Sequence, residues 1–190
     1  MTRLALGIAL VIPFGMAAAQ PVGVPNFHQV SDRIYRGAQP TREGFESLAK
    51  MGVQTIVDLR REASQVRSEQ QIVEALGMRF LSVPMTLHAP TDEQIARLLQ
   101  ELNSSAGTVF VHCHGGKDRT GTVIACYRRT HDGWDAQKAL DEANLAGMRR
   151  DVGMRRYVRE FGALRDGPRL SFVTWLWAPG TGRFQTAHLD

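Results

Sequence analysis

The segment from Thr108 to Arg129 constrains the fold more than any other part of the sequence. Residues 108–112 form a short run rich in β-branched and aromatic side chains, and residues 120–129 have a helical pattern. Between them lie two adjacent glycines, Gly115 and Gly116, which allow a tight turn. Strands that turn directly into helices are the building units of α/β proteins. We therefore expect residues 108–112 to form a central strand.

Strands and helices alternate along the rest of the chain. Further strands are predicted at residues 34–37, 53–59 and 80–83. Helices are predicted to follow the capping residues Thr41 and Thr91 and to span residues 64–76, 134–145 and 152–164. This order predicts a single-domain α/β fold, with a central, mostly parallel sheet flanked by helices.

Residues 1–19 have the three-part layout of a secretory signal peptide. Arg3 supplies a positive charge, residues 4–16 are mostly apolar, and three alanines at 17–19 precede Gln20. The apolar run is shorter than the roughly 20 residues of a conventional membrane span. We therefore prefer a cleaved signal over an uncleaved anchor, and expect no stable membrane span after cleavage.

The rest of the chain is predicted to divide into three parts. Residues 20–27 are expected to be a linker, residues 28–166 the catalytic domain, and residues 167–190 a C-terminal extension. The extension contains apolar residues, among them Phe172 and Trp175, that favour a final helix or strand packed on the domain. Contact with a partner or a membrane is the alternative.

The charge balance suits an anionic substrate and does not indicate nucleic-acid binding. Removing Arg3 from the 23 lysines and arginines leaves 22 against 19 acidic residues. Proteins that bind nucleic acids usually carry a denser basic stripe interleaved with aromatic residues. We therefore expect no nucleic-acid partner.

The two cysteines, Cys113 and Cys126, are predicted to have different roles. Cys126 lies about two turns into the helix that starts near Arg119, roughly 10 Å from its beginning. That distance is beyond the reach of a disulfide to Cys113 unless the loop folds back. We therefore interpret Cys126 as a core residue.

The chemistry is predicted to lie in the turn that begins at Cys113. A strand-to-helix turn with two glycines can point its backbone amides at an anion, and the helix presents its positive end to the same place. Arg119 can bind two phosphate oxygens with its guanidinium fork. The same field stabilises a thiolate at Cys113, which can attack phosphorus and form a phosphocysteine. Thr120 can donate a hydrogen bond to the sulfur.

The sequence from His112 to Gly121 resembles the signature loop of the protein tyrosine phosphatase superfamily, in its dual-specificity-like branch. The segments Ile34–Pro40 and Val57–Arg60 precede it in the order usual among small exported bacterial members, and the resemblance covers residues 28–165. It implies hydrolysis of phosphotyrosine, and also of phosphoserine or phosphothreonine, without a metal or cofactor. The implied phosphate-binding residues are His114, Gly115, Gly116, Lys117, Asp118 and Arg119.

The identity of the general acid is open. The family usually supplies it from an aspartate in the loop before the signature, here residues 84–92, whose middle contains no aspartate. Asp92 is the preferred candidate, although an acidic residue in a first helical turn also stabilises the helix dipole. His88 and Asp118 are alternatives, and for Asp118 we favour a role in orienting Arg119.

Two other groups of polar residues have competing interpretations. Asp58 and Arg60 end a predicted strand, so they either lie beside the pocket rim or form an ordinary surface ion pair. His112 and His114 flank the cysteine but should point to opposite faces, which does not favour a metal site, and the resemblance implies a structural role for His112. An arginine cluster is either a solvated face or a binding surface for a phosphate-rich substrate; its members are Arg149, Arg150, Arg155, Arg156 and Arg159.

Alternative functions remain alongside the preferred one. Lys117 and His114 add cations to the loop, which suits a phosphoinositide or inositol phosphate, so the partner is a phosphorylated protein, small molecule or lipid headgroup. A rhodanese-like sulfur transferase is disfavoured by the position of Arg119 and by the hydroxyl of Thr120. A phosphate-binding pseudophosphatase is the non-enzymatic alternative, because the acid is uncertain.

The signal-peptide prediction implies export to the periplasm or the medium, with a mature N-terminus near Gln20. N-terminal sequencing of the exported protein should begin there. Recovery of the chain from the cytosol with Met1 intact would contradict this prediction.

Overall fold

The computed structural model describes residues 20–149 and 152–162, together with residues 174–177 and 184–187. Its main sheet has five strands in the order β1–β2–β5–β3–β4. Their bounds are β1 (His28–Gln29), β2 (Ile34–Gly37), β3 (Val53–Asp58), β4 (Arg79–Ser82) and β5 (Thr108–His112). β1 is antiparallel to β2, and the other neighbouring pairs are parallel. The predicted mostly parallel sheet, with residues 108–112 at its centre, is confirmed.

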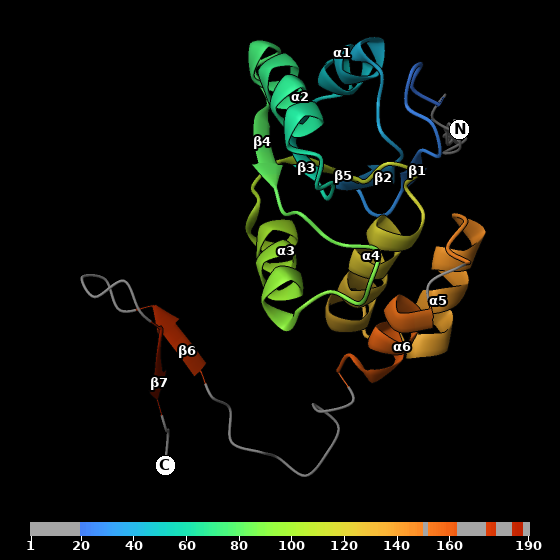
Figure 1. Cartoon of the computed structure of the whole chain (residues 1–190), viewed down its shortest axis with the longest axis vertical. Coiled ribbons are helices and arrows are strands. Elements are labelled where there is room, and N and C mark those ends of the chain that lie inside the picture. The colour runs from blue at the N-terminus through green and yellow to red at the C-terminus, as the bar shows by residue number, and fades with distance from the viewer. Residues whose placement is uncertain (1–19, 150–151, 163–173, 178–183, 188–190) are drawn as a thin grey trace, which may run out of the picture.

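Helices cover both faces of the sheet (Figure 1). On one face lie α1 (Arg42–Lys50) and α2 (Ala63–Ala75). On the other face lie α3 (Asp92–Ser104), α4 (Asp118–His131), α5 (Ala136–Leu145) and α6 (Val152–Glu160). Each face of the sheet has its own hydrophobic core. Because side chains alternate along a strand, β5 contributes Phe110 to the core beneath α1 and α2, and Val109 and Val111 to the core on the other face.

Two helix starts are capped as the sequence predicts. The Thr41 hydroxyl accepts a hydrogen bond from the Gly44 amide at 3.1 Å. Thr91 and Gln94 form a capping box, each side chain bonding the other residue's backbone amide, at 3.2 and 2.9 Å. α4 begins at Asp118, two residues before the predicted start at Thr120, so Arg119 lies within its first turn.

Residues 20–27 are not a free linker. Val24 and Phe27 are each only 5% exposed and pack with the core residues beneath α1 and α2. The Ala38 amide donates to the Pro25 carbonyl at 2.8 Å, and the Thr41 amide donates to the Gly23 carbonyl at 2.9 Å. The predicted domain start at residue 28 is therefore too late, because apolar side chains and backbone hydrogen bonds anchor this segment.

The C-terminal extension contains two short strands, β6 (Thr174–Trp177) and β7 (Phe184–Ala187), which pair antiparallel. A final strand is one of the two predicted alternatives. The helix predicted at 152–164 ends at Glu160, and residues 161–162 form a turn. Phe172 and residues 163–164 lie outside the described residues. Among the described helices, none is both long and apolar enough to cross a membrane.

Candidate active site

The glycine turn after β5 lies where three parallel strands end. His112, the last residue of β5, is paired with Gly37 of β2 on one side and Asp58 of β3 on the other. α4 begins at Asp118, so residues 113–117 form the whole connection. We call residues 113–119 the signature loop. It occupies the carboxyl edge of the sheet, where open α/β folds bind ligands, and the positive end of α4 lies beside it.

Cys113 and Arg119, the predicted nucleophile and phosphate clamp, are nearly enclosed, with exposed fractions of 3% and 9%. The Arg119 side chain is held by two backbone carbonyls: its Nη1 donates to Leu59 at 3.3 Å and to Met85 at 3.5 Å. Leu59 follows β3, and Met85 lies just beyond β4. Two neighbouring strand ends therefore help to position the guanidinium.

The amides of the signature loop are free to bind an anion. Within the described part of the chain, the N–H groups of Gly115, Gly116 and Lys117 donate to no protein acceptor. Gly116 has a φ of +65°, a left-handed conformation that an L side chain rarely adopts. A Cβ added there would lie 2.4 Å from the backbone of Gly37. The close docking of the loop on β2 therefore requires glycine at this position.

A chain of buried polar side chains ends at His112, the residue before Cys113. Arg60 binds both oxygens of Asp58, at 2.9–3.1 Å, and reaches Glu69 at 2.6 Å. Glu69 in turn lies 2.7 Å from His112 Nε2. We call Asp58, Arg60, Glu69 and His112 the buried charge chain. Burial by itself would lower the pKa of Arg60. The hydrogen bonds to Asp58 and the negative charges of Asp58 and Glu69 outweigh burial, so the pKa of Arg60 is raised.

The buried charge chain corrects one interpretation of Asp58 and Arg60. Their side chains are 0% and 4% exposed, so their ion pair is buried and not at the surface. Leu59, the residue between them, accepts a hydrogen bond from Arg119, so this strand end does lie beside the predicted phosphate site. The structural role implied for His112 agrees with its contacts to Glu69 and to the Cys113 carbonyl. Asp58, Glu69 and His112 could each offer a metal-ligand atom. Both carboxylates, however, already bind the Arg60 guanidinium.

The comparisons with known proteins agree with this geometry. Residues 20–159 match the family described as "DSP-PTPase phosphatase fused to NAD+ Kinase". The chain belongs to this dual-specificity phosphatase family. It is 31% identical over 169 residues to dual specificity protein phosphatase TpbA of Pseudomonas aeruginosa, covering 86% of this chain and 73% of that protein.

A solved structure of TpbA and one further relative are also informative. The crystal structure of a cysteine-to-serine TpbA in complex with pTyr matches with a TM-score of 0.65 and 26% identity, covering 80% of this chain and 96% of that one. Inositol diphosphatase DSP5 of Arabidopsis thaliana is 28% identical over 151 residues, which are 74% of this chain and 72% of that protein.

In this dual-specificity phosphatase, Asp92 lies away from the signature loop. Its Oδ1 accepts a hydrogen bond of 2.7 Å from the Tyr157 hydroxyl of α6. Burial, and to a lesser extent the charge of Asp92, raise the pKa of Cys126, which lies eight residues beyond Asp118 on α4. Figure 1 shows why Asp92 lies far from the signature loop: α3 begins at its end remote from the sheet, whereas α4 begins beside the sheet.

Of the other two acid candidates, Asp118 belongs to the signature loop itself, and His88 lies in the segment whose Met85 carbonyl binds Arg119. Asp118 is half-buried at the start of α4, and its Oδ1 accepts from the Arg149 amide at 3.3 Å. Among the described contacts, Asp118 makes no hydrogen bond to the Arg119 side chain, so the expected orienting role has no contact to support it. His88 is exposed, three residues after the Met85 carbonyl that binds Arg119.

The predicted arginine cluster is only partly described, because Arg150 lies outside the described residues. Arg156 pairs with Glu160 at 2.7 Å on the surface of α6, and Arg155 binds Asn144. Arg149 is exposed, and among the described residues it lines a recess of about 500 Å³ with Lys117, Asp118 and Gly147. This recess directly adjoins the signature loop.

The remaining cysteine has no catalytic environment. Cys126 is fully buried, and neither it nor Cys113 forms a disulfide. The prediction that Cys126 is a core residue is confirmed.

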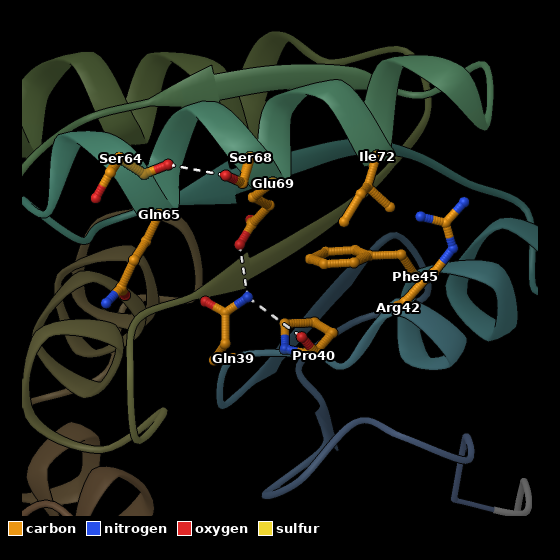
Figure 2. Close-up of a pocket in the computed structure, with 9 residues that line it drawn as sticks. All are labelled: Gln39, Pro40, Arg42, Phe45, Ser64, Gln65, Ser68, Glu69 and Ile72. Atoms are coloured by element: carbon orange, nitrogen blue, oxygen red, sulfur yellow. Dashed lines mark hydrogen bonds between the residues drawn. The ribbon is translucent and has the colours of Figure 1, made fainter.

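A second pocket, of about 340 Å³, lies between α1 and α2 (Figure 2). Phe45 and Ile72 form its apolar side, and Gln39 and Glu69 meet in its middle, where Gln39 Nε2 donates to Glu69 at 2.6 Å. The pocket therefore adjoins the buried charge chain.

Sequence reasoning missed Glu69. It lies on α2, 43 residues before His112, and no local pattern marks it as different from the other polar residues of that helix.

The buried charge chain predicts a large cost for removing Glu69. Glu69→Ala would remove one hydrogen-bond partner each from Arg60, His112 and Gln39, and would break a buried ion pair. We therefore expect a loss of about 3–5 kcal/mol in the free energy of unfolding. Urea denaturation would measure it. Glu74→Ala is the matched control, because Glu74 is exposed on the same helix and bonds only Gln70. Equal stability of the two variants would contradict the prediction.

Proposed function

We propose that the chain hydrolyses phosphotyrosine in proteins, together with phosphoserine and phosphothreonine, through a phosphocysteine intermediate. The observation that carries this proposal is the enclosed pair of Cys113 and Arg119 on one anion-binding loop at the end of β5. The TpbA relative, solved in complex with pTyr, supports the choice of substrate.

The first step transfers the phosphoryl group to sulfur. The free amides of the signature loop and the Arg119 guanidinium hold the phosphate oxygens, where they stabilise the charge of the transition state. The Cys113 thiolate attacks phosphorus, a sulfur–phosphorus bond forms, and the bond from phosphorus to the ester oxygen breaks. The departing oxygen takes a proton from a carboxylic acid.

The second step releases phosphate. A water molecule attacks the phosphocysteine, its proton passes to the carboxylate, and the sulfur–phosphorus bond breaks to restore the thiolate. The Thr120 hydroxyl is fully buried and has no hydrogen-bond partner among the described groups. We assign it to donate to the departing sulfur.

Asp118 rather than Asp92 is our choice for the acid. Asp118 belongs to the signature loop and lines the adjoining recess, whereas Asp92 is bound to Tyr157 at the far end of the helix layer.

A specific observation favours a second substrate class. Lys117 and Arg149 place two cations on the recess beside the loop, which suits a ligand with a second phosphate. The inositol diphosphatase relative supports this alternative. Assaying the same enzyme on phosphopeptides and on inositol pyrophosphates would decide between them by kcat/KM.

We also propose that the protein is exported. The support is the charged, apolar and small-residue order of residues 1–19. A periplasmic or secreted enzyme would meet phosphorylated partners outside the cytosol.

The nucleophile is tested by Cys113→Ser. This variant should lose turnover of an aryl phosphate while still binding phosphate, because the loop amides and Arg119 remain. Cys126→Ala, which changes a buried thiol away from the loop, should stay active. Substantial turnover by Cys113→Ser in a steady-state assay would refute the cysteine mechanism.

The acid is tested by the dependence of rate on the leaving group. Asp118→Asn should slow a phosphotyrosine peptide by about 10²–10⁴-fold, and should slow a substrate with a very good leaving group much less. Asp92→Asn is the matched variant and should stay near the wild-type rate on both. If Asp92→Asn shows the leaving-group effect instead, Asp92 is the acid. If neither shows it, His88→Gln is the next variant to measure.

A further inference from the structure

The carbonyls of the signature loop are held from outside the loop. The His114 carbonyl accepts from the Gln39 amide at 3.1 Å. Asn26 Nδ2 lies 3.3 Å from the Gly115 carbonyl and 3.2 Å from the Gly116 carbonyl. The Gly116 carbonyl also accepts from Arg36 Nη2 at 2.7 Å.

These outer bonds orient the inner amides. In a trans peptide, the carbonyl of one residue and the N–H of the next point in opposite directions, and the described residues contain no cis peptide. Carbonyls held outward at residues 114–116 therefore turn the N–H groups of Gly115, Gly116 and Lys117 inward. These are the same three amides that lack a protein acceptor.

Asn26 is shaped for this task. It has a φ of +52°, the one non-glycine residue with a positive φ in the described part of the chain, and asparagine tolerates that conformation better than most residues. Its Nδ2 also lies 3.0 Å from the Ala146 carbonyl, beyond the end of α5, and its Oδ1 lies 3.0 Å from His28 Nε2. One amide group thus ties the signature loop to the end of α5, from a position 120 residues before Ala146 in the sequence.

Arg36 is the second outer contact. It is only 2% exposed, and its Nε and Nη1 have no partner among the described groups. Burial lowers the pKa of Arg36 to about 10, with the negative charges of Glu142 and Cys113 opposing that shift. The guanidinium therefore keeps its charge at neutral pH, and this charge adds to the positive field around Cys113.

We propose that Asn26 and Arg36 are positioning residues of the active site, which hold the Gly115 and Gly116 carbonyls outward so that the loop amides face the phosphate. This inference rests on the proposed phosphatase function for its consequence in turnover. It assigns a catalytic purpose to residues 20–27, which the sequence predicts to be a linker.

The test measures binding of tungstate, a tetrahedral oxyanion, by titration calorimetry, and turnover of an aryl phosphate in parallel. Asn26→Gly removes the amide group, and glycine adopts the same φ without strain. It should weaken tungstate binding by about tenfold, because two outer bonds are lost. It should lower kcat/KM to a similar extent for good and poor leaving groups, since the proton donor is untouched.

Arg36 is tested by a pair of variants. Arg36→Met removes both the bond and the charge and should weaken tungstate binding more than Arg36→Lys, which keeps the charge. Gln29→Ala is the control, because the exposed Gln29 side chain on β1 bonds the Ser31 carbonyl and, among the described contacts, reaches neither Asn26 nor the signature loop, so its tungstate binding should match the wild type. Thermal unfolding of each variant separates altered positioning from loss of the fold.

The outcomes separate this inference from the proposed function. If Asn26→Gly and Arg36→Lys bind tungstate as the wild type does, the positioning role is wrong, whatever the enzyme hydrolyses. If the wild type hydrolyses no phosphate ester but Asn26→Gly still weakens tungstate binding, the positioning role stands and the proposed function fails.

Discussion

The structure depends on the burial of four charged or polar side chains, the last of which directly precedes the nucleophile. Removing ions from water is costly, and the cost is offset only when each ion is paired in good geometry. Asp58, Arg60, Glu69 and His112 meet this condition, but only if β3, β5 and α2 hold one relative placement. The chain of bonds therefore sets the position of His112, and so the position at which the backbone leaves β5 to form the signature loop.

The signature loop is a short segment that the rest of the domain surrounds. From the sheet side it docks on β2 through Gly116, and Arg119 reaches back to carbonyls beyond β3 and β4. The carbonyls on its outer side accept hydrogen bonds from Asn26, Arg36 and Gln39. A loop with free amides gains nothing from its own hydrogen bonds, so neighbouring elements must stabilise it. Pre-organisation of this kind spares the enzyme from reorienting dipoles during the reaction.

The direction of the helices decides which acidic groups can take part in the chemistry. α3 and α4 pack side by side on the same face, but α3 begins at its end remote from the sheet and α4 begins beside the sheet. Asp92 and Asp118 each lie in the first turn of a helix, yet the two starts lie at opposite ends of the helix layer. Of these two aspartates, only Asp118 lines the recess beside the signature loop, where it lies with the cations Lys117 and Arg149.

The sequence by itself determined the local features of this protein. Cys113, the two glycines and Arg119 lie within seven consecutive residues, so their chemistry follows from a single strand–turn–helix unit, and side-chain periodicity predicted most strands and helices. Only the tertiary structure decided which residues hold the site in place. Asn26, Glu69 and Tyr157 each contact partners 43 to 120 residues away. Such contacts arise when distant elements pack together, and residue spacing carries no record of them. For this reason the buried charge chain, the anchoring of residues 20–27 and the place of Asp92 became visible only in the folded molecule.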